Sequence, residues 1–249
     1  MFPLKWDQTH HDIFLFRQAQ SGTGKTGTFT IGTLQCLDPA SDHTQALIIS
    51  PTRELSLQIA FVVASIGEYL GIKVHACVGG TVVREDIHKL KQGVHVVVGT
   101  PGRVHDMMRR GFLKTDYLKL FILDEADEML SRGFKQQIQD IFKFLPADIQ
   151  ICLFSATLPP DILGLTKHFM RSPAKILVQK EDLTLEGIHQ YYIAVEKHEW
   201  KIDVLLNLYS NLDIQQAIIY CNTKRRVDEL EKSMTEQDFV VASMHGEMD

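Results

Sequence analysis

The sequence lacks an excess of positive charge. Its 249 residues include 26 Lys and Arg against 31 Asp and Glu, which gives a net charge of −5. A chain with this balance has no global basic field that would attract nucleic acid. Any contact with RNA or DNA must therefore come from a local surface.

Three further features are missing, and each excludes a class of protein. The four cysteines are widely scattered without a C-x-x-C pair, which favours reduced core thiols over a disulfide framework or a zinc site. No apolar run reaches the roughly 18 residues of a membrane span, and the opening residues lack the basic-then-apolar order of a secretory signal. These absences predict a protein of the cytosol or nucleus with no membrane partner.

What the sequence does contain is a series of short apolar runs, each ending abruptly in small or polar residues. They read FLFRQAQSG, ALIISPTRE, HVVVGTPGR, LFILDEAD, ICLFSATL and KILVQ. Runs without alternation are typical of strands buried on both faces, and helical patterns lie between them. The succession predicts an α/β fold with an open parallel sheet flanked by helices, in which ligands bind at the carboxyl ends of the strands.

Two of the helical patterns have clear apolar spacing. For the pattern over 53–71 the expected apolar face is Leu55, Ile59, Val62, Ile66 and Tyr69, followed by a terminal glycine at Gly71. The second pattern precedes Pro146, and its expected apolar face consists of Phe134, Ile138, Ile141, Phe142 and Leu145.

The composition changes near the charged segment QKEDLTLEG, after which a second α/β succession begins with the apolar runs AIIYC and FVVASM as its expected strands. We therefore predict a first domain over 1–179, a linker over 180–187 and a partial second domain over 188–249. The last segment is shorter than the usual domain of about 100 to 150 residues.

The segment AQSGTGKT follows one apolar run and precedes a helical pattern, which is the context that a phosphate-binding loop requires. Lys25 is expected to reach the β- and γ-phosphates, and the Thr26 hydroxyl to ligate Mg²⁺. Ala19 stands where the usual pattern begins with Gly, so a flexible polar loop is the alternative. The expected anion-binding backbone consists of Ser21, Gly22, Thr23, Gly24, Lys25 and Thr26.

The run LFILDEAD places two carboxylates directly after a buried strand. Asp124 is expected to hold Mg²⁺ opposite Thr26, and Glu125 to orient or deprotonate the attacking water. By itself the segment could be an acid-rich helix N-terminus. Together with the phosphate loop it predicts a nucleoside triphosphate site whose catalytic residues are Lys25, Asp124 and Glu125.

The remaining strand ends combine helix or turn N-termini, small residues and arginines, a set that suits a sugar-phosphate backbone. The candidates are Pro51, Thr52, Arg53, Gly79, Gly80, Thr100, Pro101, Gly102 and Arg103. Two hydroxyls at another strand end, Ser155 and Thr157, could couple the nucleotide site to this surface. Taken singly, the third segment could be an ordinary Pro-Gly turn and the hydroxyls a helix N-cap.

In this order the segments resemble the DEAD-box family of ATP-dependent RNA helicases and, within it, the translation initiation factor 4A group and the nuclear ATPase of the exon junction complex. The resemblance implies RecA-like domains, ATP and Mg²⁺ as cofactors, RNA bound through its backbone, a monomer, and partners from translation initiation or the exon junction complex. It also implies RNA contacts in the second domain at Asn222, Thr223, Lys224, His245 and Gly246.

The sequence departs from the family pattern in two places. The family's upstream adenine-recognising Gln would fall near Phe2 and Pro3, where only Gln8 offers a substitute, so adenine selectivity has no assigned residue. The arginines that the family's second domain supplies are not found before Asp249. Arginine fingers contribute about 10³ to 10⁵ in rate, so we expect this chain alone to be a weak ATPase at most.

Three functions therefore compete. The first is an ATP-dependent RNA helicase, and the second is a catalytically inactive nucleotide- and RNA-binding module that acts as a competitor or scaffold. The third is another phosphate-loop enzyme such as a small-molecule kinase, which would have no use for a backbone-binding surface.

Overall fold

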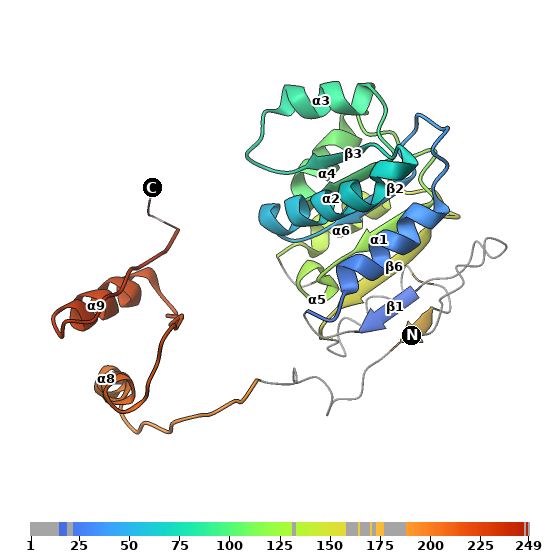
Figure 1. Ribbon diagram of the computed structural model, residues 1–249. Coiled ribbons are helices and arrows are strands. Elements are labelled where there is room, and N and C mark those ends of the chain that lie inside the picture. The colour runs from blue at the N-terminus through green and yellow to red at the C-terminus, as the bar shows by residue number, and fades with distance from the viewer. Residues whose placement is uncertain are drawn as a thin grey trace. The chain divides into compact units, whose positions relative to one another are not determined.

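The structure is a computed structural model of the chain. It describes residues 15–18, 22–130, 133–157, 164, 170, 173–176, 188–246 and 248. The chain divides into two compact units, one ending at Ile188 and the other beginning at His189 (Figure 1). The predicted linker over 180–187 lies outside the described residues.

The first unit is built on one sheet, which in the described residues has seven strands in the order β3-β4-β2-β5-β6-β1-β7. Every pairing in it is parallel. The open α/β sheet predicted from the sequence is thereby confirmed. The strands are β1 Leu15–Gln18, β2 Ala46–Ile49, β3 Val74–Cys77, β4 Val96–Gly99, β5 Leu120–Leu123, β6 Gln150–Ser155 and β7 Ala174–Ile176.

Strand β3 was not expected from the sequence. It lies at one edge of the sheet, where three of its four residues are only half-buried. An edge strand does not need a continuous apolar run, and its sequence VHAC has none. By contrast β2, β4 and β5 are buried at every position.

Helices cover both faces of the sheet (Figure 1). Along β2 the side chains alternate between two apolar clusters, since Leu47 and Ile49 join one and Ile48 the other. Helices α1 and α2 pack on the second cluster, and α3, α4, α5 and α6 on the first. The helices are α1 Lys25–Cys36, α2 Arg53–Gly67, α3 Val83–Lys91, α4 Pro101–Arg109, α5 Ala126–Met129 and α6 Lys135–Phe142, with the 3-10 helix η1 Glu68–Leu70 after α2.

The apolar face predicted for α2 is partly wrong. Ile59 is fully buried, but Ile66 is 43% exposed and Tyr69, in η1, is 95% exposed. The buried positions of α2 are Ser56, Ile59, Ala60, Val63 and Gly67. Three of these five residues are small, which allows α2 to pack closely against α1 and the sheet. The spacing of large apolar residues alone therefore does not identify the buried face.

Two other local predictions are confirmed. Gly71 ends η1 with a left-handed φ of 68°, which only glycine adopts without strain. In α6, Ile138 and Ile141 are fully buried, and Phe134, Phe142 and Leu145 pack against the same cluster.

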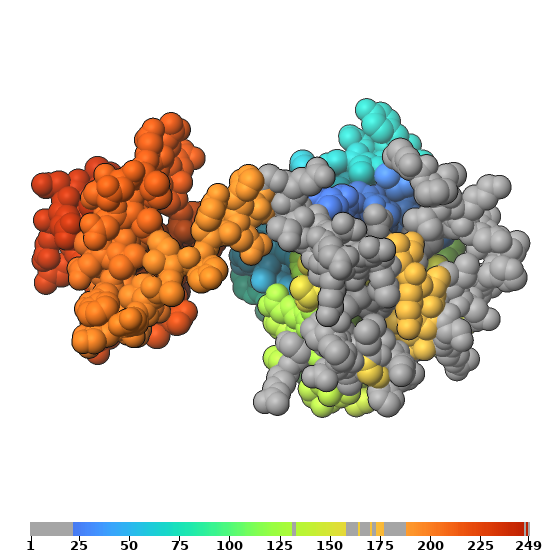
Figure 2. Space-filling model, turned by 90° about the horizontal axis from the view of Figure 1, so that it is seen from below, coloured from blue at the N-terminus to red at the C-terminus, as the bar shows by residue number. Residues whose placement is uncertain are grey.

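The second unit (Figure 2, orange to red) contains the helices α8 Lys201–Asn211 and α9 Lys224–Thr235 and the 3-10 helix η3 His198–Trp200. Its expected strands do not form in the described residues. Ile218 is 79% exposed, Tyr220 89% and Val240 fully exposed. The apolar pattern there has no paired neighbour, and a strand without one leaves its backbone groups to water.

Candidate nucleotide site and nucleic-acid interface

The parallel sheet brings the carboxyl ends of its strands to one edge. Strand β6 lies between β1, which leads to the phosphate loop, and β5, which leads to Asp124. Gln18, the last residue of β1, is in register with Ser155 at the end of β6. Segments that lie far apart in the sequence are therefore neighbours at this edge.

The phosphate loop has the backbone that its glycines permit. Gly22 and Gly24 have φ values of 79° and 87°, in the left-handed region that favours glycine. Gly24 is the N-cap of α1, and its carbonyl accepts hydrogen bonds from Thr28 N at 3.0 Å and Thr28 Oγ1 at 2.9 Å. Ser21 lies outside the described residues. The loop thus opens a 12-residue helix whose N-terminus favours an anion.

Lys25 is the first residue of α1 and is only 7% exposed. Its charge lowers the pKa of both Asp124 and Glu125, which opposes the effect of their burial. The three groups therefore converge at the strand ends, although about a hundred residues of chain separate the lysine from the carboxylates.

Asp124 is 3% exposed, and its backbone N–H donates to Ile49 O at 2.9 Å. Burial, followed by the neighbouring Glu125 charge, raises the pKa of Asp124 to about 6. Its Oδ1 is buried without a hydrogen-bond partner among the described residues. A carboxylate oxygen left in this state fits a position facing a cation or the water bound to one.

Glu125 follows directly and has a left-handed backbone, with φ 49°. This conformation is uncommon for a residue other than glycine, and such residues cluster at functional sites. Burial raises the pKa of Glu125.

The residues at the site suit Mg²⁺ rather than a metal held wholly by protein ligands. Among the described residues no group of three or more His, Cys, Asp or Glu side chains is placed to hold a metal ion. Magnesium uses one or two carboxylates together with substrate phosphates and water. Thr26, half-buried in the first turn of α1, and Asp124 meet that requirement.

The hydroxyls of the SAT segment connect to the acidic segment. Ser155 Oγ donates to Thr157 O at 2.8 Å and accepts from Thr157 N at 3.3 Å. Thr157 Oγ1 donates to Asp127 Oδ2. Asp127 had no role in the sequence interpretation, although it is the last letter of the DEAD tetrad. It links the end of β6 to α5, which begins just after Glu125.

The first two segments that the sequence predicted to bind a sugar-phosphate backbone lie beside each other. Thr52 is the N-cap of α2, and its hydroxyl accepts from Leu55 N at 3.3 Å. Gly80 has φ 80°, and a Cβ at this position would lie 2.7 Å from Arg53 Nη1. The left-handed backbone therefore favours glycine here, and the short distance places the guanidinium of Arg53 beside the Gly79–Gly80 turn.

The third segment opens α4, with Thr100 as N-cap and Pro101 in the first turn. Thr100 N donates to Cys77 O at 3.2 Å, and a Cβ at Gly99 would meet the same carbonyl at 2.2 Å. The start of α4 is thus held against the end of β3, next to the Gly79–Gly80 turn. Gly102 lies in the first turn of the same helix.

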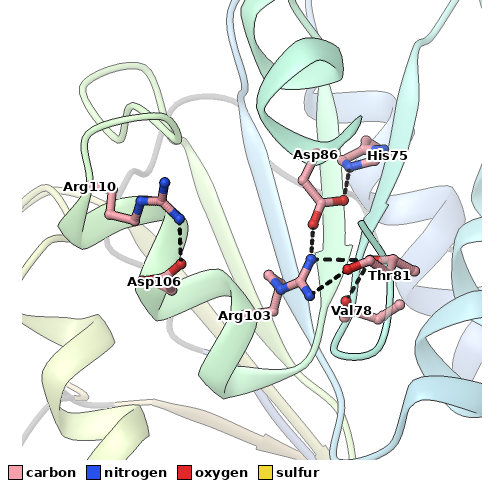
Figure 3. Close-up of polar contacts among 7 residues, drawn as sticks. All are labelled: His75, Val78, Thr81, Asp86, Arg103, Asp106 and Arg110. Carbon is pink, nitrogen blue, oxygen red and sulfur yellow. Dashed lines mark hydrogen bonds and ion pairs between the residues drawn. The ribbon is translucent and has the colours of Figure 1, made fainter. Parts of the chain in front are cut away.

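Arg103 was predicted as a phosphate ligand, but its guanidinium is engaged within the protein (Figure 3). It donates to Thr81 Oγ1 at 3.1 Å, to Thr81 O at 2.9 Å and to Asp86 Oδ2. His75 Nε2 lies 2.9 Å from the other oxygen of Asp86. No motif in the sequence marked Thr81, Asp86 or His75.

In the second unit the expected RNA-contact residues gather around α9. Thr223 is its N-cap and accepts from Arg226 N at 3.3 Å, with Asn222 and Lys224 on either side. His245 Nε2 lies 3.1 Å from Asp228 Oδ1, which brings the His245–Gly246 segment to the same helix.

An open parallel sheet with a glycine-rich loop before a helix, and an acidic pair at a nearby strand end, defines a phosphate-loop nucleotide-binding protein. Comparisons with known proteins narrow this class. A family model described as DEAD/DEAH box helicase matches residues 6–164. The chain belongs to this family of ATP-dependent helicases.

Relatives and solved structures agree with the family assignment. The chain is 63% identical over 232 residues to eukaryotic initiation factor 4A of Cryptosporidium parvum, covering 93% of this chain and 57% of that protein. It is 59% identical to the ATP-dependent RNA helicase eIF4A of Schizosaccharomyces pombe, covering 93% and 59%. Among solved structures, S. cerevisiae Dbp5 bound to RNA and ADP BeF3 matches with a TM-score of 0.80 and 31% identity, covering 95% of this chain and 60% of that one.

The chain therefore spans about 60% of the length of these relatives. None of the helices in the described residues has the length and apolar content needed to cross a membrane.

Proposed function

We propose that this chain binds ATP with Mg²⁺ at the phosphate loop and holds the backbone of RNA at the neighbouring strand ends, as part of an ATP-dependent RNA helicase. The observation that carries the proposal is that Lys25, buried at the start of α1, lies near Asp124 and Glu125 at the end of β5. The lysine charge opposes the rise that burial causes in the pKa of both carboxylates. These are the groups that phosphoryl transfer requires at one place.

Each residue has a distinct part in this chemistry. Lys25 binds the β- and γ-phosphates, and the backbone from Gly22 to Thr26 cradles them at the α1 N-terminus. Thr26 and Asp124 hold Mg²⁺, which when bound neutralises charge on the phosphate oxygens. Glu125 orients the attacking water and receives its proton.

RNA is held through its sugar-phosphate chain, without reading of the bases. The N-termini of α2 and α4 direct backbone N–H groups and helix dipoles toward phosphates, and Arg53 adds a positive charge. The Dbp5 structure that matches this chain has RNA and ADP BeF3 bound, which supports both ligands. The hydrogen bonds from Ser155 to Thr157 and from Thr157 to Asp127 join the end of β6 to α5, and in this proposal Ser155 and Thr157 couple the nucleotide site to the RNA surface.

Assayed by itself, the 249-residue chain hydrolyses ATP slowly and does not unwind RNA. We expect this because the 249 residues contain no segment that resembles the arginine-bearing segments of the family's second domain, and arginine fingers contribute about 10³ to 10⁵ in rate. The alternative is a catalytically inactive module that binds nucleotide and RNA as a competitor or scaffold. Under either proposal, the partners of this chain are proteins of translation initiation or of the exon junction complex, as its resemblance to the initiation factor 4A group and to the exon junction complex ATPase implies.

The decisive experiment measures ATP turnover with and without RNA, together with binding of a fluorescent ATP analogue, in this chain and in Lys25→Ala. The helicase proposal expects slow turnover that RNA stimulates and that the variant loses. Equal turnover in both chains with retained RNA binding favours the module. Absence of ATP binding would refute both.

A further inference from the structure

The Gly79–Gly80 turn is clamped by side chains that no family motif assigns to it. Thr81 Oγ1, just after the two glycines, donates to Val78 O, just before them, at 2.8 Å. Arg103 Nη1 donates to the same hydroxyl at 3.1 Å, and Nη2 to the Thr81 carbonyl at 2.9 Å. Figure 3 shows the guanidinium of α4 reaching across to this turn.

The guanidinium is itself fixed from behind. Asp86, on α3, is 2% exposed and accepts from Arg103 Nη1 through Oδ2 and faces His75 Nε2, 2.9 Å away, through Oδ1. The side chains of Arg103 and His75 are only 11% and 15% exposed. A planar fork bound to a buried carboxylate has few alternative rotamers, so the chain from Asp86 to Arg103 to Thr81 is rigid.

This arrangement conflicts with a direct phosphate contact by Arg103. To reach a phosphate, the guanidinium would have to give up its ion pair with the buried Asp86 and leave that carboxylate with His75 as its remaining side-chain partner, which is unfavourable. Arg53 is placed differently, because its Nη1 approaches Gly80 from the α2 side of the turn. The two arginines of the surface therefore have different tasks.

We propose that Asp86 and Arg103 are positioning residues of the RNA-binding surface, which hold the Val78–Thr81 turn in its binding conformation without touching RNA. The proposal rests on the proposed function, because it specifies how that same surface is built. According to this proposal, RNA binding requires Asp86 although its negative charge by itself repels the RNA.

Removal of the Asp86 charge tests the proposal, because positioning and electrostatics predict opposite changes in RNA affinity. Asp86→Asn removes a negative charge near the RNA surface, so electrostatics alone predicts equal or tighter binding to a single-stranded RNA. Positioning predicts the opposite, about tenfold weaker binding, since the asparagine no longer anchors the guanidinium. The matched control is Asp106→Asn on α4, where the aspartate pairs with the exposed Arg109 and Arg110. This control makes the same charge change outside the clamp and should bind RNA as tightly as the parent chain or more tightly.

Arg103→Lys separates positioning from contact. Lysine keeps the charge but loses the fork, so the proposal expects the same tenfold loss as Asp86→Asn and no further loss in the double variant. In Arg103→Gln, which removes the charge, the dependence of RNA binding on salt should keep its slope, because no phosphate contact is removed. Binding by Asp86→Asn at parent strength, or a slope reduced by about 0.7 in Arg103→Gln, would overturn the proposal.

Two further measurements keep the outcome decisive. If Asp86→Asn fails to fold, Thr81→Val removes only the hydroxyl that joins Arg103 to Val78, and it must also weaken binding. Amide hydrogen exchange at Gly79–Thr81 reports the clamp without RNA and should accelerate in each variant but not in Asp106→Asn. If the parent chain binds no RNA, the proposed function is wrong. If amide hydrogen exchange at Gly79–Thr81 is unchanged in the variants, the positioning role of Asp86 and Arg103 is wrong.

Discussion

Apolar runs of similar sequence are buried in the first unit and exposed in the second. In the first, the runs of β2, β4 and β5 are buried at every residue between parallel neighbours. In the second, Ile218 and Tyr220 belong to a run of the same character but are 79% and 89% exposed. An apolar run therefore becomes a strand only where other strands pair with its backbone, and composition alone does not supply them.

The comparison extends to charged groups. In the first unit Lys25, Asp86 and Asp124 are buried, and their charges act on one another or on close partners. In the second unit the ion pairs lie on the surface of α9, where solvent screens them and the contribution to stability is small. The proposed nucleotide site accordingly lies in the unit where burial makes electrostatic interactions strong.

The largest expected contrast is in backbone protection. Amide hydrogens of β4 and β5 should exchange on the order of 10⁴-fold more slowly than those of 217–221 and 239–245, because only the former lie in a closed ladder. Hydrogen exchange followed by mass spectrometry measures this ratio. Similar protection in both segments would show that the second unit does form a sheet.

Thiol reactivity should divide the units in the same way. Cys77 is fully buried, and burial, followed by the Asp86 charge, raises its pKa from an ordinary value of 9.0 to about 12. Its thiolate fraction near neutral pH falls about a thousandfold for such a shift. Cys221 of the second unit is only half-buried. We expect iodoacetamide to modify Cys221 first and Cys77 only on unfolding, as peptide mapping would reveal; simultaneous labelling would contradict this.

A matched pair of substitutions tests the packing difference. Ile122→Ala in β5 empties a fully buried position and should lower the free energy of unfolding by about 2 to 5 kcal/mol. Ile218→Ala makes the identical change at a 79% exposed site and should stay within about 0.5 kcal/mol of the parent. Denaturant titration measures both, and equal losses would mean that Ile218 is packed in solution.

The smallest effect concerns the charge on Asp124. Its pKa in the fold, about 6, lies above the ordinary 3.8, so the ionised carboxylate destabilises the fold above pH 6 and this penalty vanishes as the pH falls toward 4. Asp124→Asn should therefore stabilise the protein at pH 7.5 by on the order of 2 kcal/mol while abolishing ATP turnover.

The control comes from the second unit. A hydrogen bond from Arg225 outweighs the effect of desolvation and lowers the pKa of Glu229, so Glu229→Gln should weaken the fold slightly at pH 7.5. Denaturation of both variants at pH 7.5 and pH 4 gives the signs. A gain for Asp124→Asn that is as large at pH 4 would disprove its electrostatic origin.

Much of the first unit could be predicted because its sequence signals are local. Continuous apolar runs gave all its strands except β3, whose edge position leaves its side chains half-buried. The face of α2 was predicted only in part, since Ser56, Ala60 and Gly67 share the buried face with Ile59, whereas Ile66 is exposed. The candidate site could be predicted from Lys25, which opens α1 after the glycine-rich loop, and from Asp124, which directly follows β5. The contacts that join Arg103 to Thr81 and Asp86, and Asp86 to His75, follow no short motif.

The sequence by itself determined the fold class, the family and the position of the proposed phosphate loop, because glycine placement, strand runs and strand-end residues are encoded within a few neighbouring positions. Only the tertiary structure decided that Arg103 faces Asp86 and Thr81 and not the surface, and that Asp124 is buried with one oxygen unpaired. The physical reason is that burial and partner choice depend on which distant segments meet, and parallel pairing brings together residues that are far apart along the chain.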